Sequence, residues 1–97
     1  MSRDEIIAKL KETAPALRAK GVTRLAIFGS RARDDAREDS DLDVLIDVDD
    51  TKFKGLDIVR VQDIVKQATG LDTQAEMRRS IEPRFAKRIA DDLIEVF

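Results

Sequence analysis

The chain has 97 residues, a length that suits one domain covering residues 1–97 but not a second hydrophobic core. Hydrophobic residues make up 42% and charged residues 39%, as in a globular domain with an ionic surface. Cysteine and histidine are absent, which excludes disulfides, thiol or imidazole nucleophiles and typical zinc sites. The net charge of −2, without tryptophan or tyrosine, argues against long nucleic acid as a partner.

The apolar stretches of the chain are short. The run at residues 25–28 is among the longest, and none of them is long enough to span a bilayer. The first residues do not form a secretory signal. We therefore expect a cytoplasmic protein that does not interact with membranes.

The first third of the chain predicts a helix followed by a buried strand. Apolar residues recur at helical spacing over residues 3–20, and Gly21 is placed to end that helix. Residues 22–28 then read as a strand whose apolar run indicates burial on both faces. Gly29 interrupts this strand.

The middle of the chain predicts a polar turn followed by a strand with one acidic face. Residues 30–39 have almost no apolar side chains, which indicates a short helical turn and a solvated loop. From residue 41 to 49 the apolar residues alternate with polar ones. The polar positions include Asp41, Asp43, Asp47 and Asp49.

The last part predicts two helices and two short strands. Helical spacing covers residues 56–68, and Gly70 follows as a stop signal. Residues 71–75 suit a short third strand, Ser80 suits the cap of a last helix, and residues 94–96 suit a final short strand. The expected fold class is therefore α/β (α+β), with a small mixed β-sheet flanked by helices.

Asp41 and Asp43 require an explanation as a pair. They stand two residues apart on the predicted strand, so both carboxylates leave the same face. At a separation of about 5 Å they would repel by roughly 3 kcal/mol at an effective dielectric near 20. A divalent cation reverses that sign, and Mg²⁺ suits oxygen ligands that are completed by phosphates. A lone Asp-x-Asp is better explained as a solvated strand face, because such motifs are common and of low specificity.

The residues before this pair favour the metal-site interpretation. Gly29 and Ser30 stand where a buried strand gives way to a helical turn, a place where backbone amides can approach a phosphate. Gly29-Ser30, ten intervening residues and Asp41-Leu42-Asp43 together resemble the signature of the DNA-polymerase-beta-like nucleotidyltransferase superfamily. The fuller string, from Gly29 to Arg33 with Ser40 to Asp43, resembles its minimal nucleotidyltransferase (MNT) branch.

The resemblance implies roles for individual residues. Gly29 and Ser30 would hold the triphosphate of ATP, and Asp41 and Asp43 would hold Mg²⁺ as metal ligands and catalytic acids. Arg31 or Arg33 would neutralise the leaving pyrophosphate, with Arg33 favoured, although either could instead pair with nearby acids. The family often has glycine where this chain has Asp34.

The superfamily also uses a third carboxylate from a later strand. Asp72 is the first candidate, as a third metal ligand and catalytic acid, because it follows the Gly70 stop at the start of the third predicted strand. The acids that compete with it are Asp57, Asp63 and Glu76.

MNT proteins include the antitoxins of HEPN–MNT toxin–antitoxin pairs. The resemblance thus implies an Mg²⁺-dependent protein adenylyltransferase that moves AMP from ATP to a tyrosine of a partner HEPN toxin. One alternative is an antitoxin that acts by binding alone. Another is nucleotidyl transfer to a small hydroxylated molecule such as an antibiotic, which the shortness of the chain disfavours.

Overall fold

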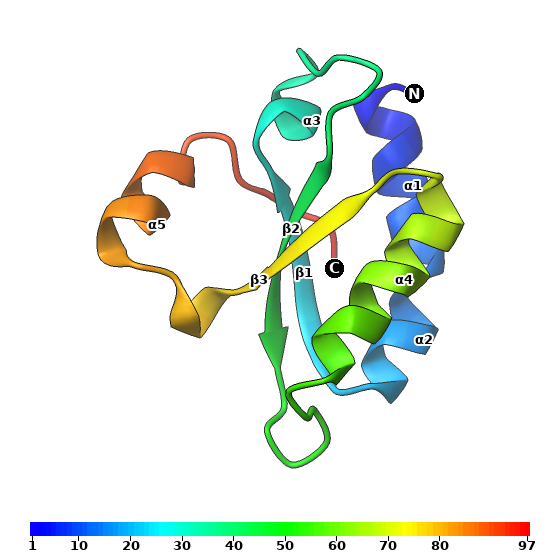
Figure 1. Ribbon diagram of the computed structural model, residues 1–97, viewed down its shortest axis with the longest axis vertical. Helices are drawn as coiled ribbons and strands as arrows, with labels where there is room; N and C mark the ends of the chain where they lie inside the picture. The colour runs from blue at the N-terminus through cyan, green and yellow to red at the C-terminus, as the bar shows by residue number, and fades with distance from the viewer.

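Four strands form one mixed sheet in the computed structural model, which describes all 97 residues. The central strands, β1 (Val22–Phe28) and β2 (Leu42–Val48), are antiparallel. Strand β3 (Thr73–Met77) lies parallel to β2, and β4 (Ile94–Glu95) lies antiparallel to β1 (Figure 1). The predicted fold class, a small mixed sheet flanked by helices, is confirmed.

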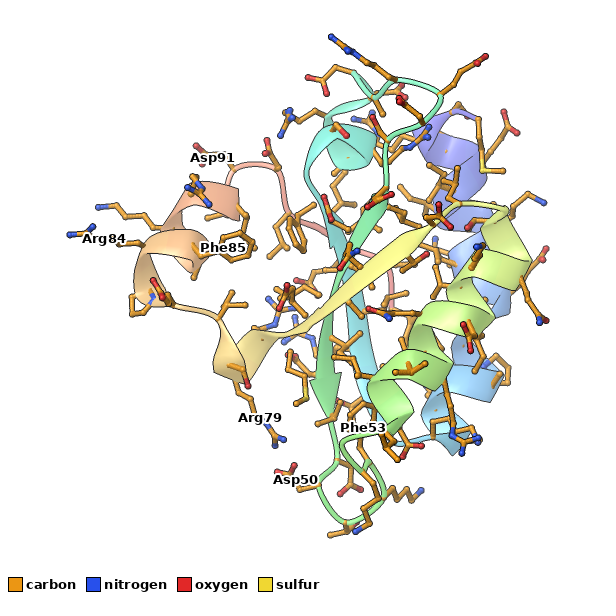
Figure 2. All side chains as sticks on the ribbon, viewed as in Figure 1. Asp50, Phe53, Arg79, Arg84, Phe85 and Asp91 are labelled. Atoms are coloured by element: carbon orange, nitrogen blue, oxygen red, sulfur yellow. The ribbon has the colours of Figure 1, made fainter.

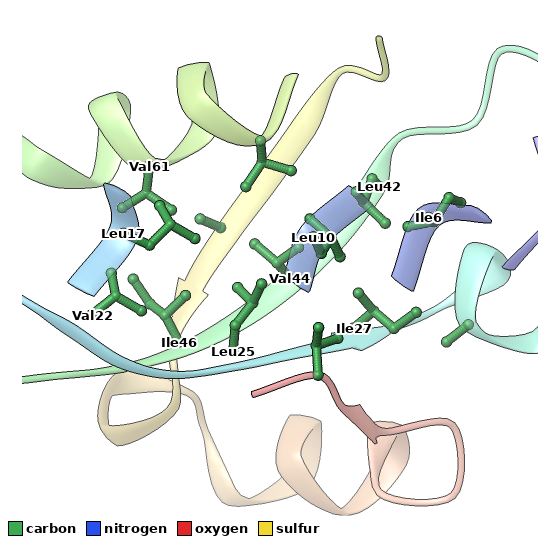
Figure 3. Close-up of a cluster of buried hydrophobic side chains, with 14 of the residues drawn as sticks. Ile6, Leu10, Leu17, Val22, Leu25, Ile27, Leu42, Val44, Ile46 and Val61 are labelled. Atoms are coloured by element: carbon green, nitrogen blue, oxygen red, sulfur yellow. The ribbon is translucent and has the colours of Figure 1, made fainter. Parts of the chain in front are cut away.

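Three helices cover one face of the sheet. They are α1 (Arg3–Glu12), α2 (Ala14–Ala19) and α4 (Asp57–Thr69), and their apolar side chains meet those of the central strands in the larger hydrophobic cluster (Figure 3). Val44 and Ile46 of β2 are fully buried in it, as the alternation of the sequence predicts. No helix combines the length and the apolar character needed to cross a bilayer.

The opposite face of the sheet is covered by α5 (Pro83–Ile89), which stands apart from the other helices (Figure 1). A small cluster of Ala26, Phe28, Leu45 and Ile89 joins this helix to β1 and β2. The ring of Phe85 contacts the ring of Phe28 edge to face, with the centroids 5.7 Å apart. Because this layer is thin, much of the polar face of β2 and β3 stays open.

Two predictions about the helices were wrong. The predicted helix over residues 3–20 is broken at Thr13, because Pro15 has no amide hydrogen to continue the ladder and instead sits in the first turn of α2. Ser80 does not cap the last helix. It closes the short 3₁₀ turn η1 (Arg78–Ser80), and α5 begins at Pro83 after an extended Glu82.

The turn and loop between β1 and β2 follow the prediction. Helix α3 (Ser30–Arg33) is one helical turn, and irregular chain leads from it to β2. Gly70 ends α4 in the left-handed conformation, with φ of 75°. The third strand begins at Thr73, two residues later than predicted.

Candidate functional site

Gly29 joins the end of β1 to α3 in a conformation that other residues rarely adopt, with φ of 76°. The position that a side chain would occupy at Gly29 is taken by Asp43. A Cβ atom built on Gly29 would lie 2.6 Å from Asp43 Oδ2. The carbonyl of Gly29 accepts the amides of Ala32 and Arg33, which fixes the turn. The half-buried Ser30 therefore opens α3 directly beside the acidic pair.

Asp43 reaches this position through strand pairing. It is the register partner of Phe28, the residue before Gly29, across the antiparallel β1–β2 ladder. Asp43 is half-buried and Asp41, just before the strand, is exposed. Burial raises the pKa of Asp43, and the negative charges of Asp41 and Glu76 raise it further. The structure thus joins the two halves of the sequence motif and leaves a carboxylate there without a neutralising cation.

The other two acids of this strand face have partners of their own. Asp47 pairs with Arg78 at 2.8 Å and with Arg24 at 3.4 Å. Asp49 accepts hydrogen bonds from the hydroxyl and amide of Thr51, which lower its pKa. Neither Asp41 nor Asp43 has an ion-pair partner within the chain. Only the motif pair is therefore left open for a ligand.

Arg31 and Arg33 have different places in the structure. Arg31 is buried, with 6% of its surface exposed, and donates to the carbonyls of Glu38 and Ser40. It holds the loop that delivers Asp41. Exposed Arg33 pairs with Asp35 at 3.1 Å and with Asp92 at 2.8 Å, and these bonds raise its pKa.

Asp34 takes the conformation for which glycine is best suited. Its φ of 63° places it in the left-handed region at the end of α3, which aspartate tolerates better than most residues. The side chain also accepts the amide of Arg3 at the start of α1. The departure from the family pattern at Asp34 therefore leaves a glycine-like backbone conformation in place.

The structure does not bring Asp72 to the acidic pair. Its carboxylate is 72% exposed and pairs with Lys66 of α4 at 2.7 Å. Its backbone carbonyl accepts the amide of Leu42, so it is the main chain that approaches the site. No group of three or more acidic side chains lies close enough to hold a metal ion, so Asp41, Asp43 and Asp72 do not form one cluster.

Another acid of the third strand faces the site. Gln74 is the register partner of Asp43 and Glu76 is that of Leu45, so both side chains share the sheet face of Asp43. The charge of Glu76 acts on Asp43. The competing acids of α4, Asp57 and Asp63, belong to the helix on the opposite face.

The sequence carries a signal for this orientation of β3. From residue 72 to 78 the charged and amide side chains stand at every second position, which predicts one strongly polar face. Residues 73 and 75 are buried while 74 and 76 are exposed. That alternation gives Gln74 and Glu76 a common face, but only the register with β2 shows which of them lies beside Asp43.

The donor set fits Mg²⁺ better than a softer metal. Asp41 and Asp43 supply oxygen ligands without a competing ion pair, and no cysteine or histidine is present to select zinc. Two protein carboxylates leave most of an octahedral shell to water and phosphate oxygens, a usual arrangement for Mg²⁺.

A glycine turn beside two unpaired acids, on a small mixed sheet, is the arrangement expected of a nucleotidyltransferase. The chain belongs to the nucleotidyltransferase domain family, whose model matches residues 5–96. A protein of Methanocaldococcus jannaschii, MJ0435, named as a candidate protein adenylyltransferase, is 33% identical over 96 residues and covers 99% of each chain.

Two solved structures have the same fold. One, described as a candidate minimal nucleotidyltransferase, superposes with a TM-score of 0.82 at 28% identity, over 97% of this chain and 95% of that one. The other is a complex of tri-AMPylated HEPN toxin and MNT antitoxin from Shewanella oneidensis, matched with a TM-score of 0.61 at 16% identity, over 98% and 68% of the chains. The resemblance to minimal nucleotidyltransferases is confirmed.

Proposed function

We propose that this chain is a protein adenylyltransferase that uses Mg²⁺ to move AMP from ATP to a tyrosine hydroxyl of a partner HEPN toxin. The observation that carries the proposal is the packing of Gly29 against the unpaired carboxylate of Asp43. The similarity to a candidate adenylyltransferase and to an antitoxin of an AMPylated HEPN toxin supports the choice of acceptor. We place the activity in the cytoplasm, where ATP is available.

Each residue of the site has a part in the proposed reaction. The turn at Gly29 and the hydroxyl of Ser30 bind the triphosphate tail, and Asp41 and Asp43 hold Mg²⁺. When bound, Mg²⁺ supplies charge neutralisation for the phosphates. Arg31 acts by positioning the Asp41 loop. Arg33 is the proposed cation for the leaving pyrophosphate, and it would first have to leave Asp35 and Asp92.

Glu76 is the proposed third acid, in place of Asp72. It extends from β3 on the same sheet face as Asp43, and its charge acts on Asp43. We expect Glu76→Gln to bind ATP normally but to transfer AMP at least about 100-fold more slowly, the usual range for a lost general base. Asp72→Asn is the matched control. If it lost transfer instead, with Glu76→Gln active, Asp72 would be the third acid.

The proposal is tested by incubating the chain with α-labelled ATP, Mg²⁺ and the protein encoded beside it. The expected result is label on the partner with the native chain and none with Asp41→Asn or Asp43→Asn. Mass spectrometry of the labelled partner identifies the modified hydroxyl, and loss of the added mass after treatment with a phosphodiesterase that releases AMP checks the assignment. Label on serine or threonine alone would contradict the tyrosine assignment.

A second candidate is an antitoxin that neutralises its partner by binding alone. The specific observation in its favour is Gln74, a neutral amide beside Asp43, together with the lack of a three-acid cluster. The same experiment separates the two candidates. Neutralisation of the partner by Asp43→Asn, without label in any sample, would establish the binding function and exclude transfer.

A further inference from the structure

A groove of about 490 Å³ lies between β3 and α5, on the sheet face that carries Asp43. Glu76 lines it from the strand side, and Phe85 and Arg88 line it from the helix, with Ile81 between the two elements. Its volume is within the range of about 300–1,000 Å³ typical of ligand sites.

A contact between two aromatic rings links the wall of the groove to the candidate site. Phe85 points from α5 toward the sheet (Figure 2) and meets Phe28, which is the register partner of Asp43. The Arg88 guanidinium lies over the Phe85 ring, 5.4 Å from its centroid. A planar aromatic group entering the groove would therefore meet both a ring and a stacked cation.

The direction of the reaction decides which substrate enters the groove. In an in-line displacement the attacking and leaving oxygens stand on opposite sides of the phosphorus. In the proposed function the pyrophosphate leaves toward Gly29 and Ser30 at the end of β1. With Asp43 on β2 between them, the opposite side is β3, where Glu76 opens into the groove. The acceptor, and not the nucleotide, is thus expected there.

The charges of α5 indicate what surrounds the acceptor hydroxyl. Arg84 and Arg88 line the groove and form no ion pair within the chain, although 20 acidic residues are present. Glu82 also lines the groove, but it is the N-cap residue of α5 and lies about 9 Å along the helix axis from Arg88. Resting on the proposed function, we propose that this groove receives the acceptor tyrosine within an acidic segment.

With the acceptor tyrosine in the groove, AMP is transferred in one displacement at the α-phosphorus. The phenolic oxygen forms a bond to the α-phosphorus of ATP while the bond from that phosphorus to the α–β bridging oxygen breaks. The phenolic proton passes to the Glu76 carboxylate, and the pyrophosphate carries the bridging oxygen away. The products are a tyrosine whose phenolic oxygen carries AMP in a phosphodiester bond, and pyrophosphate.

Two NMR titrations of the ¹⁵N-labelled chain test the placement. The probes are ATP with Mg²⁺, and a short synthetic peptide with glutamate on both sides of a tyrosine. The peptide is expected to shift the amides of Glu76, Phe85 and Arg88, and ATP those of Gly29 and Ser30. Shifts of the groove amides with ATP, or peptide shifts elsewhere or absent, would overturn the proposal. Failure of ATP to shift Gly29 and Ser30 would instead count against the proposed function.

A charge reversal tests the preference for acids. Arg88→Glu is expected to weaken binding of the acidic peptide about tenfold and to raise the acceptor KM in the transfer assay, with kcat and the KM for ATP unchanged. Lys87→Glu is the matched control, because it makes the same charge change on the same helix without lining the groove. Equal effects of the two variants, or equal binding by the native chain of a peptide with lysine in place of glutamate, would overturn the acidic preference.

Discussion

Gly29 and Gly70 both have a positive φ, but only one of them touches the site. Their φ values are 76° and 75°, but ψ is −158° at Gly29 and 7° at Gly70, so only Gly70 has the left-handed helical conformation. A Cβ added at Gly29 would meet the Asp43 carboxylate, whereas nothing lies within 4 Å of a Cβ added at Gly70. A side chain at Gly70 therefore meets backbone strain alone, whereas a side chain at Gly29 meets a conformation that is essentially restricted to glycine and also the Asp43 carboxylate.

Gly29→Ala is expected to displace Asp43 and to abolish binding of Mg²⁺–ATP, measured by calorimetric titration. Gly70→Ala should cost only the backbone strain, about 1–2 kcal/mol, and should bind normally. Normal binding by Gly29→Ala would show that the approach of Gly29 to Asp43 is not needed for the ligand.

The raised pKa of Asp43 makes the stability of the ligand-free protein depend on pH. Because its pKa is raised in the folded state, the folded chain holds this proton more tightly than the unfolded chain does. Its contribution to stability is therefore lost as the pH rises from the unfolded value, near 3.9, through the folded pKa. At pH values well above the folded pKa, the loss of stability no longer changes with pH.

Asp43→Asn should accordingly have a higher Tm than the native chain at pH 7 without metal, by a few degrees. At a pH below about 3.9 the difference should vanish, because the native carboxyl is then protonated in both states. Asp47→Asn is the control of opposite sign, because it loses Arg24 and Arg78 as partners. A lower Tm for Asp43→Asn at pH 7 would contradict this account.

At the scale of the elements, the loop between α3 and β2 depends on one buried arginine. Arg31→Ala removes the donor to the Glu38 and Ser40 carbonyls and should lower the free energy of unfolding by about 2 kcal/mol or more. Arg33→Ala removes only exposed ion pairs, worth about 0–1 kcal/mol. Urea denaturation measures both. Equal losses would mean that Arg31 does not hold the loop.

Local patterns predicted much of these elements, and pairing between distant elements accounts for what they missed. The strands around Ile27 and Val44 follow from alternation and apolar runs, and the approach of Gly29 to Asp43 follows from their place at paired strand ends. Sequence spacing could not assign the third acid. It favoured Asp72, which follows the helix stop, whereas the β2–β3 register places Glu76 on the open face.

The same limit applies to side chains whose role depends on what they meet. Arg31 and Arg33 look alike in the sequence, and only the path of the following loop buries the first. The break at Thr13 had a local signal in Pro15 that outweighs the helical periodicity. The groove at Arg88 had only a weak signal in the sequence. Residues 83–89 include three basic residues and no acidic residue.

For the whole molecule, the two faces of the sheet have separate roles. Helices α1, α2 and α4 lie on one side of the sheet and α5 lies on the other (Figure 1). The first face contains the larger hydrophobic cluster, whereas the second carries the Asp43 carboxylate and the groove. This division explains how so short a chain can combine a core with a site. It also explains why an acceptor carried by a second protein suits the thin α5 side.

In the proposed function, Asp41 and Asp43 together hold the metal ion of a bound nucleotide. A crystal structure with Mn²⁺ and a non-hydrolysable ATP analogue tests it most directly. We predict an anomalous peak coordinated by both carboxylates, with the triphosphate on the Gly29–Ser30 turn. A triphosphate bound elsewhere, or one on that turn with no metal at either aspartate, would contradict the claim.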